Sequence, residues 1–276
     1  MSLYCLVSPA KTLDMAPTPA DLPWTIPELL DHACELIGLL RGISPSGLEG
    51  LMSISPALAQ VNFQRFLSFS VPFTPQHCRP AVLMFRGDTY RGLQAWTLTR
   101  DQLLHVQRHL TILSGLYGVL RPLDLVFPYR LEMKTPLATQ RGVGLVRYWG
   151  ALPAQVIARR AREVGAEAVV NCASDEYFRA VDLTQMPMPV ITPIFQESRD
   201  GGPRRGLSMP VKRLRGRMAR RIITEGWTRP EQIQAFDEEG FRYRPEFSTP
   251  EAWVYLRCVD SKGAASSESV PCRSPS

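Results

Sequence analysis

The first residues that could do chemistry follow an apolar run at positions 3–7. This run predicts a buried strand, and Ser8-Pro9 ends it just before Lys11. Ligands bind at strand ends in α/β sheets, so Lys11 could contact a phosphate there. Ser8 and Lys11 also match the Ser-x-x-Lys pattern of serine acyl-transfer enzymes. That pattern is common by chance and no Lys-Thr-Gly motif accompanies it, so the motif alone favours a strand-ending turn with a solvated lysine.

A second group of candidates lies between Arg86 and Gly92, after an apolar run at 81–85 that predicts another buried strand. The loop holds two arginines and two glycines together with Asp88 and Tyr90. Such a loop suits a site where backbone and guanidinium groups both approach an anion. The Walker A pattern does not occur in the chain. Taken alone, the loop favours a tight turn with an Arg–Asp pair.

A third group is the Gly-x-x-Gly pattern of Gly115 and Gly118, which follows a helix predicted from a capping box at Thr99. The pattern resembles the hairpin of helix-hairpin-helix modules, whose glycines turn backbone N–H groups toward a DNA phosphate. Arg121 lies just beyond it, and Pro122 limits the length of a second helix. The alternative is a glycine that ends the helix, followed by a turn.

A fourth group follows a third apolar run, at 168–172. Asn171, Ser174, Asp175 and Glu176 lie at or beyond the end of this predicted strand. The two acids could pair with a cation, with a metal or with a basic helix. On local grounds, an N-cap with acids in the first helical turn is favoured.

Signals for a metal or another cofactor are poor. His105 and His109 are four residues apart on one predicted helix, but no acid or cysteine at fitting spacing completes a metal site. The six cysteines are scattered singly without a Cys-x-x-Cys pair, which indicates a reducing compartment and argues against a disulfide scaffold or a zinc site. We therefore predict neither a bound metal nor a cofactor.

The elements that must position these residues alternate along the chain. A single α/β domain with a mixed sheet flanked by helices is expected over residues 1–257, and a disordered tail over 258–276. The predicted strands lie at 3–7, 81–85, 168–172, 190–195, 206–209, 241–243 and 253–256, and the predicted helices within 27–40, 45–51, 56–66, 100–113, 145–164, 212–225 and 230–236. Pro153 is expected to kink or break the helix at 145–164.

Composition places the chain among soluble globular proteins, with 45% apolar and 21% charged residues over 276 positions. Its apolar runs are too short for a membrane span, and its first residues do not form a signal peptide, so a cytoplasmic location is expected. The net charge of +6 is local: eight basic side chains and no acid occur from Arg204 to Arg221, leaving −2 for the rest. Such a cluster indicates an anionic partner or a solvated helix face.

Together, these motifs resemble the YaaA peroxide-stress protein family. The resemblance covers residues 1–257 and rests on SPAKTLD, FRGDTYRGLQA, LSGLYGVLRPLDLVFPYRLEM, NCASDEYF and the run from Lys212 to Gly216. The residues that match the family motifs are Ser8, Lys11, Arg86, Asp88, Tyr90, Gly92, Arg121, Arg130, Asn171, Ser174, Asp175, Glu176, Lys212, Arg215 and Gly216. Arg204 and Arg205 lie outside those motifs, and no function is carried onto them.

The resemblance implies a bacterial, cytoplasmic protein that helps cells survive hydrogen peroxide and is associated with lowered free intracellular iron. It also implies a basic cleft, a helix-hairpin-helix-like element and binding of double-stranded or branched DNA without sequence specificity. No enzymatic reaction is established for the family, which favours a protein that is not an enzyme. We expect the cleft cations to be Lys11, Arg86, Arg121, Arg130, Lys212 and Arg215, with backbone donors from Gly115 and Gly118. Few aromatic residues lie among the basic residues, so base stacking is not indicated. The oligomeric state stays open.

The alternative is an enzyme that acts on a phosphorylated or nucleotide substrate. Asp88, Asp175 and Glu176 would repel phosphate in a cleft meant only for DNA, unless they orient cations or hold Mg²⁺. Convergence of Lys11, Asp88, Tyr90 and Asp175 in one small pocket would favour the enzyme, whereas a long open groove would favour DNA. Direct iron binding would need a cluster of His, Asp and Glu that the sequence does not assemble.

Overall fold

A computed structural model describes residues 2–17, 22–198, 203–204 and 209–258. Its centre is an eight-stranded mixed sheet in the order β13-β14-β11-β10-β1-β5-β6, with β12 paired to β11. The strands are β1 (Ser2–Val7), β5 (Leu110–Ser114), β6 (Gly118–Leu120), β10 (Ala166–Cys172), β11 (Val190–Ser198), β12 (Pro203–Arg204), β13 (Arg242–Tyr243) and β14 (Ala252–Cys258). This confirms the single α/β domain with a mixed sheet.

The five inner strands β5, β1, β10, β11 and β14 are parallel, while β6, β12 and β13 add antiparallel pairs at the margins. All six residues of β1 are buried, as a strand covered on both faces requires. Cys5 of β1 pairs with Val170 of β10 on one side and with Leu110 of β5 on the other. The carboxyl ends of β1 and β10 therefore lie side by side.

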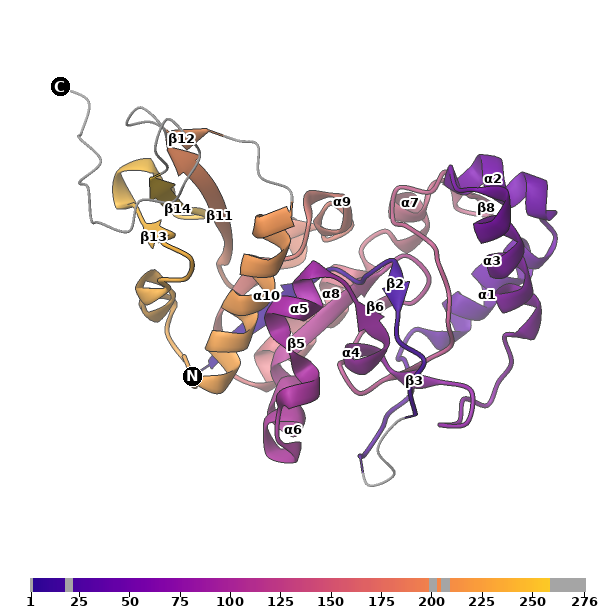
Figure 1. The fold of residues 1–276 in the computed structure, drawn as a ribbon, viewed down its shortest axis with the longest axis horizontal. Helices are drawn as coiled ribbons and strands as arrows, with labels where there is room; N and C mark the ends of the chain where they lie inside the picture. The colour runs from indigo at the N-terminus through magenta and orange to yellow at the C-terminus, as the bar shows by residue number, and fades with distance from the viewer. Residues whose placement is uncertain (1, 18–21, 199–202, 205–208, 259–276) are drawn as a thin grey trace.

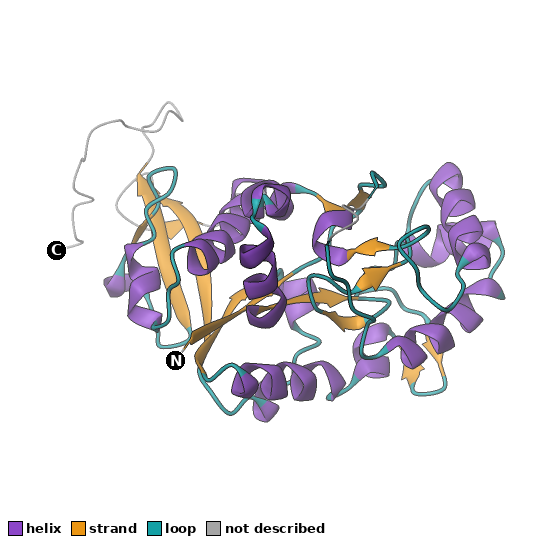
Figure 2. Cartoon of the chain, turned by 90° about the horizontal axis from the view of Figure 1, so that it is seen from below, coloured by secondary structure: helices purple, strands orange, loops and turns teal. Residues whose placement is uncertain are grey.

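Helices cover both sides of the strands, as Figure 2 shows. They are α1 (Leu30–Arg41), α2 (Pro45–Met52), α3 (Pro56–Ser68), α4 (Ala81–Met84), α5 (Asp88–Leu93), α6 (Arg100–His109), α7 (Leu145–Trp149), α8 (Leu152–Glu163), α9 (Asp175–Phe178) and α10 (Met209–Thr224). Four 3₁₀ turns, η1 (Ala95–Thr97), η2 (Leu183–Gln185), η3 (Pro230–Ala235) and η4 (Pro245–Phe247), complete the described helical segments. In Figure 1, α1, α2 and α3 gather at one end of the elongated molecule and β13 and β14 at the other.

Three small antiparallel pairs complete the described strands. β2 (Thr12–Leu13) pairs with β4 (Phe85–Arg86), β3 (Arg79–Pro80) with β7 (Leu125–Val126), and β8 (Ala138–Thr139) with β9 (Gly142–Val143). The first of these pairs matters most for function, because it fixes the segment after β1 against the start of the 86–92 loop.

Most of the predicted elements are present. The strand predicted at 206–209 and the tail predicted at 258–276 lie outside the described residues, apart from Met209, which begins α10, and Cys258, which ends β14. The run at 81–85 is wrong as a strand: Ala81–Met84 is a buried turn of helix, and only Phe85–Arg86 is extended. A short, wholly apolar run has no period that separates the two forms. The helix at 145–164 is broken as expected, with Gly150 at φ +53° between α7 and α8 and Pro153 in the first turn of α8.

The predicted helix-hairpin-helix-like element at 113–120 is also wrong. β5 and β6 form a buried β-hairpin there, with Ser114 paired to Gly118. A Cβ on Gly115 would lie 2.2 Å from the carbonyl oxygen of Leu131, and Gly118 has φ +66° against the ring of Trp149. These glycines permit close internal packing within the buried hairpin.

The closest packing between helices joins α5 to α10 through two glycines. A Cβ on Gly216 would lie 1.8 Å from the carbonyl oxygen of Thr89, and one on Gly92 would lie 2.1 Å from that of Arg213. Neither distance is possible for a real side chain, so the two backbones touch directly. This contact holds α5, which follows Arg86, against the first half of α10, which carries Lys212 and Arg215.

The first prediction concerns this contact. Gly216→Ala is expected to lower the free energy of unfolding by about 3 kcal/mol or more, because the methyl group must push two helix backbones apart. Gly50→Ala is the matched control, since Gly50 is a glycine of α2 and a methyl group added to it would meet nothing within 4 Å. That control is expected to stabilise by about 0.5–1 kcal/mol. Urea denaturation measures both, and equal stability of the two variants would contradict the contact.

Candidate anion-binding cleft

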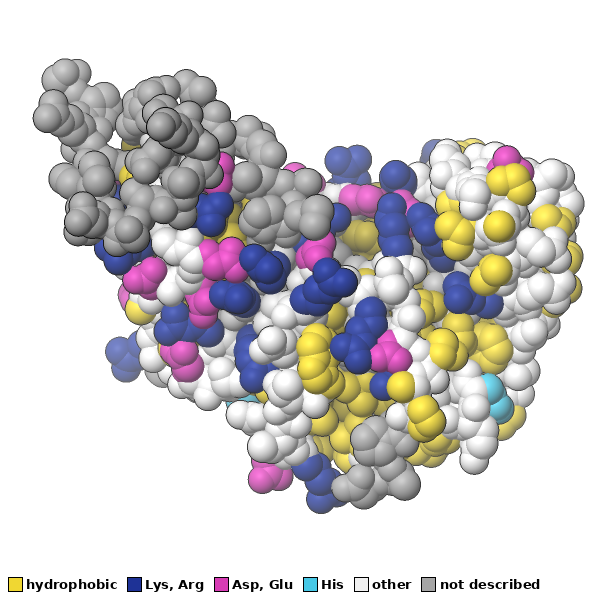
Figure 3. All heavy atoms as spheres, viewed as in Figure 1, with side chains coloured by type: hydrophobic (Ala, Val, Ile, Leu, Met, Phe, Trp, Pro, Cys, Tyr) yellow, Lys and Arg dark blue, Asp and Glu magenta, His cyan; other side chains and the backbone are white. Residues whose placement is uncertain are grey.

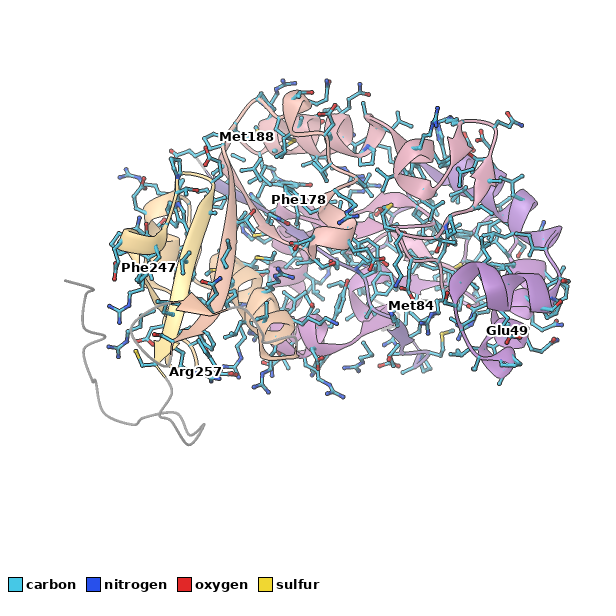
Figure 4. All side chains as sticks on the ribbon, turned by 90° about the horizontal axis from the view of Figure 1, so that it is seen from above. Glu49, Met84, Phe178, Met188, Phe247 and Arg257 are labelled. Carbon is cyan, nitrogen blue, oxygen red and sulfur yellow. The ribbon has the colours of Figure 1, made fainter. Side chains whose placement is uncertain are left out.

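A cavity of about 370 Å³ opens where β1 and β10 end. Its walls come from the segment after β1, the β4–α5 junction, the segment 129–132, the turn after β10 and the first part of α10. The lining residues are Ser8, Pro9, Ala10, Lys11, Thr12, Arg86, Gly87, Asp88, Thr89, Tyr129, Arg130, Leu131, Glu132, Cys172, Ser174, Glu176, Tyr177, Lys212 and Arg215. We call this cavity the cleft. Viewed from above (Figure 4), Phe178 of α9, next to the lining residue Tyr177, lies in the middle of the molecule, between Glu49 and Phe247.

The cleft brings together nine of the candidates named from the sequence. Five of them are the cations Lys11, Arg86, Arg130, Lys212 and Arg215, and four are Ser8, Asp88, Ser174 and Glu176. They come from segments that are far apart in the chain and meet only because β1 and β10 are neighbours. The parallel sheet therefore assembles a basic site at its carboxyl edge, as the rule for strand ends predicts.

Six other candidates do not line the cleft. Gly115 and Gly118 belong to the buried hairpin described above. Arg121 is paired with the buried Asp124 at 3.0 Å, and Asp175 is an exposed residue at the start of α9. Two further candidates, Tyr90 and Asn171, are buried beneath the site.

Those two buried residues position the cleft from below. The hydroxyl of Tyr90 donates to the backbone carbonyl of Ser8 at 3.2 Å, and burial raises the pKa of Tyr90 well above its usual value. The Asn171 amide donates to Thr192 Oγ1 at 3.2 Å and accepts from the N–H of Ala173 at 3.0 Å. Both side chains therefore shape the turns after β1 and β10.

Ser8 and Ser174 join the ends of the two strands. Ser8 Oγ donates to Ser174 Oγ at 3.1 Å and accepts from the N–H of Ser174 at 2.8 Å. The ammonium of Lys11 meanwhile pairs with Glu132 at 3.1 Å. This arrangement is not the serine–lysine pair of acyl transfer, which needs the lysine to accept the serine proton.

Glu132 is the functional residue that sequence reasoning missed. Its carboxylate meets Lys11 at 3.1 Å, Arg130 at 3.0 Å and Lys134 at 3.5 Å, although the side chain is only 9% exposed. Burial by itself would raise the pKa of Glu132, but the hydrogen bonds and charges of Lys11 and Arg130 outweigh it and hold the pKa below its usual range. The alternation of Arg130, Glu132 and Lys134 along the chain was the available signal.

Asp14 orders the opposite wall. Its carboxylate accepts from Arg86 Nε at 2.7 Å and pairs with Arg79 Nη1 at 2.7 Å. The N–H of Ala16 also donates to it at 2.8 Å. This backbone hydrogen bond, followed by those from Arg86 and Arg79, lowers the pKa of Asp14 from 3.8 to about 2 against the effect of burial. The bonds to Asp14 thus fix the orientation of the Arg86 guanidinium at the wall of the cleft.

Three of the six basic side chains of α10 are paired with acids within the protein. Arg213 pairs with Glu239 at 2.9 Å, and Arg221 with Glu225 at 2.6 Å. Arg217 bridges to Glu238 and Glu239. On the face drawn in Figure 3, blue and magenta side chains accordingly alternate over α10. Arg213, Arg217 and Arg221 therefore fit the interpretation of the basic cluster as a solvated helix face. Arg205 and the side chain of Arg204 lie outside what the structure describes.

Lys212 and Arg215 are the members of the cluster that line the cleft. Lys212 is exposed, whereas Arg215 is largely buried, and burial lowers the pKa of its guanidinium. Its Nε is a buried donor without a hydrogen-bond partner in the described structure. A buried unpaired donor is costly. An anion in the cleft would offset the charge of this guanidinium, which lines the cavity.

The histidine pair does not belong to the cleft. The rings of His105 and His109 stack at 4.0 Å on α6, and burial lowers the pKa of both. The residues that the structure describes contain no group of three or more His, Cys, Asp or Glu placed to hold a metal. None of the described helices has the length and apolarity needed to cross a membrane.

The second prediction concerns pH. The pKa of Asp14 in the folded protein, about 2, lies below the ordinary 3.8, so its pairing stabilises the fold above about pH 4 and this stabilisation is lost as the pH falls toward 2. Asp14→Asn lacks this contribution at every pH. The difference in free energy of unfolding between the wild type and Asp14→Asn is therefore expected to shrink from pH 6 to pH 2.5, which denaturation curves in urea measure. A difference that stays constant would contradict the assignment.

The fold and the cleft define an α/β protein that gathers cations at the carboxyl edge of its sheet. The family model described as "Peroxide stress protein YaaA" matches residues 3–247, and the chain belongs to this family. The resemblance drawn from the sequence motifs is thereby confirmed.

Its relatives match over nearly their whole length. The chain is 44% identical over 255 residues to a UPF0246 protein of Magnetococcus marinus, covering 92% of this chain and 99% of that relative. A UPF0246 protein of Hahella chejuensis is 42% identical over 255 residues, and one of Laribacter hongkongensis 43% over 256, each with the same coverage.

Proposed function

We propose that this peroxide-stress protein acts in the cytoplasm and binds DNA through phosphate groups held in the cleft. The observation that carries the proposal is the gathering of five cations around one cavity, where the largely buried Arg215 lies with Lys11, Arg86, Arg130 and Lys212. Charge-assisted hydrogen bonds from guanidinium to phosphate are among the strongest in proteins. A phosphate in the cleft would offset the positive charge of the largely buried Arg215.

The size of the cleft limits how DNA would bind. A volume of about 370 Å³ admits a phosphate with its sugar or one nucleotide, whereas a duplex is roughly 20 Å across, nearly twice its ~12 Å major groove. The protein would therefore contact a duplex at its surface, with one backbone segment or an unpaired nucleotide entering the cleft. Such binding reads backbone and shape rather than sequence, and it suits branched or distorted DNA.

The third prediction is a steep salt dependence. Affinity for a labelled duplex and for a four-way junction is expected to fall sharply between about 50 and 200 mM salt, because bound phosphates release counterions. Lys212→Ala is expected to weaken binding and to lower the slope of log K against log salt by about one, the share of a single phosphate contact. Fluorescence anisotropy measures both quantities.

The control for this experiment is Arg108→Ala. Arg108 is an exposed cation near the end of α6, just before β5 begins and so at the opposite edge of the sheet from the cleft. Arg108→Ala removes one positive charge, as Lys212→Ala does, but at a place away from the cleft. The salt slope of Arg108→Ala is therefore expected to match that of the wild type. A flat salt response of the wild type, or equal losses in both variants, would sink the proposal. The association with lowered free iron belongs to the same proposal and is tested by labile-iron measurement in cells that carry Lys212→Ala.

A second candidate is an enzyme for a phosphorylated or nucleotide substrate. The observation in its favour is the cavity itself, whose volume lies within the ~300–1,000 Å³ range of small-molecule pockets and which places Asp88, Glu132 and Glu176 among the cations. Since the pKa of Glu132 is lowered, its carboxylate would serve as a proton acceptor rather than a donor. Arg215 and Lys11 would hold the phosphate.

The fourth prediction tests this candidate. If the protein is an enzyme, a set of nucleoside and sugar phosphates should include one that is consumed with time, and Glu132→Gln should slow its turnover at least about 100-fold, far more than it changes the binding constant. Chromatography of reaction mixtures at enzyme concentrations close to substrate measures turnover, and calorimetry measures binding. If every compound is recovered unchanged, the DNA proposal stands alone.

A further inference from the structure

An exposed tryptophan stacks on one of the cleft arginines. Trp96 belongs to η1, directly after α5, and its ring centroid lies 4.3 Å from the guanidinium carbon of Arg86. The ring is 45% exposed, and Arg86 lines the cleft. Trp96 therefore places an aromatic ring against one of the cleft cations. Trp96 lies outside the basic run of the sequence, where aromatic residues are few.

Arg86 is held as a fixed plane. Asp14 binds its edge through Nε at 2.7 Å and Nη2 at 2.6 Å, and Trp96 covers one of its faces. The Arg86 side chain remains 37% exposed and lines the cleft. A planar guanidinium accepts a second flat group on its free face, and nucleobases are flat groups that stack on both arginine and aromatic side chains.

The tryptophan and the phosphate-binding cations belong to one rigid unit. Arg220 of α10 donates through Nη1 to the carbonyl oxygens of Leu93 at 2.8 Å and Gln94 at 3.1 Å, at the end of α5. Gln94 has φ +50°, which turns the chain sharply into η1. Together with the glycine contact of α5 and α10, these bonds set Trp96 at a fixed place relative to Lys212 and Arg215.

We propose that the cleft takes a nucleotide, with its phosphate at Arg215 and Lys212 and its base on the stack formed by Arg86 and Trp96. The inference rests on the proposed function, because it assumes that phosphate binds in the cleft. It adds the chemical class of the ligand: a phosphate that carries a base, rather than phosphate alone. The nucleotide is either free or an unpaired nucleotide of a DNA strand, and both present the same chemistry.

The first test compares two ligands that differ only by the base. Adenosine 5′-monophosphate is expected to bind wild-type protein at least about fivefold more tightly than ribose 5-phosphate, because the base stacks on the free face of the Arg86 guanidinium, which Trp96 holds in place. Trp96→Leu is expected to remove the difference, whereas Trp96→Tyr should keep most of it. Calorimetry gives the affinities, and quenching of tryptophan fluorescence by the nucleotide should disappear in Trp96→Leu.

Trp24→Leu is the matched control, since Trp24 is also 45% exposed and does not line the cleft. This variant is expected to retain both the fluorescence quenching and the preference for the base. Equal affinity of the two ligands for the wild type, or equal loss in Trp24→Leu and Trp96→Leu, would overturn the stacking proposal while leaving phosphate binding in place. Failure of both ligands and of DNA to bind would instead overturn the proposed function.

The second test separates the two sources of the nucleotide. A duplex with one unpaired adenosine is compared with the same duplex carrying an abasic sugar at that position. A DNA source predicts at least about fivefold tighter binding of the first, lost in Trp96→Leu. A preference for the base with the mononucleotide but not in the duplex assigns the site to free nucleotides. No preference with either would overturn the inference.

Discussion

The direct contact of α5 with α10 is the constraint on which the cleft depends. Gly92 and Gly216 let two helix backbones touch, and no other residue fits at either position. The contact brings the side chains before and at the start of α5 next to those in the first half of α10. It thereby holds Arg86 of β4 and Arg215 of α10 at the same cavity, which would lose one wall without it. Thus two residues without side chains determine where the charged ones lie.

The cleft also shows how a protein keeps several cations close together without a ligand. Glu132 and Asp14 each bind two or more of the surrounding basic side chains. The cations thereby stay ordered but not fully satisfied, since among the described residues the carboxylates leave Arg215 without a partner for its Nε. The acids thus orient the cations, a role that accounts for carboxylates in a site for an anion. Because the groups are already in place, binding requires little further ordering.

The sequence predicted the site residues that follow strands, but not the residues whose roles depend on partners distant in the chain. Ser8, Lys11, Ser174 and Glu176 follow runs that are strands in the structure, so the rule for strand ends located them. Arg121 and the glycine pair at 115–118 were chosen by residue type, but their roles are set by the partners Asp124, Leu131 and Trp149, which are not readable from local pattern. Sequence patterns also could not separate the α10 cations that pair with acids from those that line the cleft. The acids Glu238 and Glu239 lie beyond the end of α10 in the chain, so their pairing with Arg213 and Arg217 depends on the fold.

The bond between Ser8 and Ser174 spans 166 residues of the chain. Parallel strands that are distant in sequence pair late in folding, since a long loop must close before the contact forms. The last wall of the cleft comes from α10, so a ribosome must release more than three-quarters of the chain before Arg215 can join Lys11. The cavity therefore cannot be complete until every segment from β1 to α10 has been synthesised.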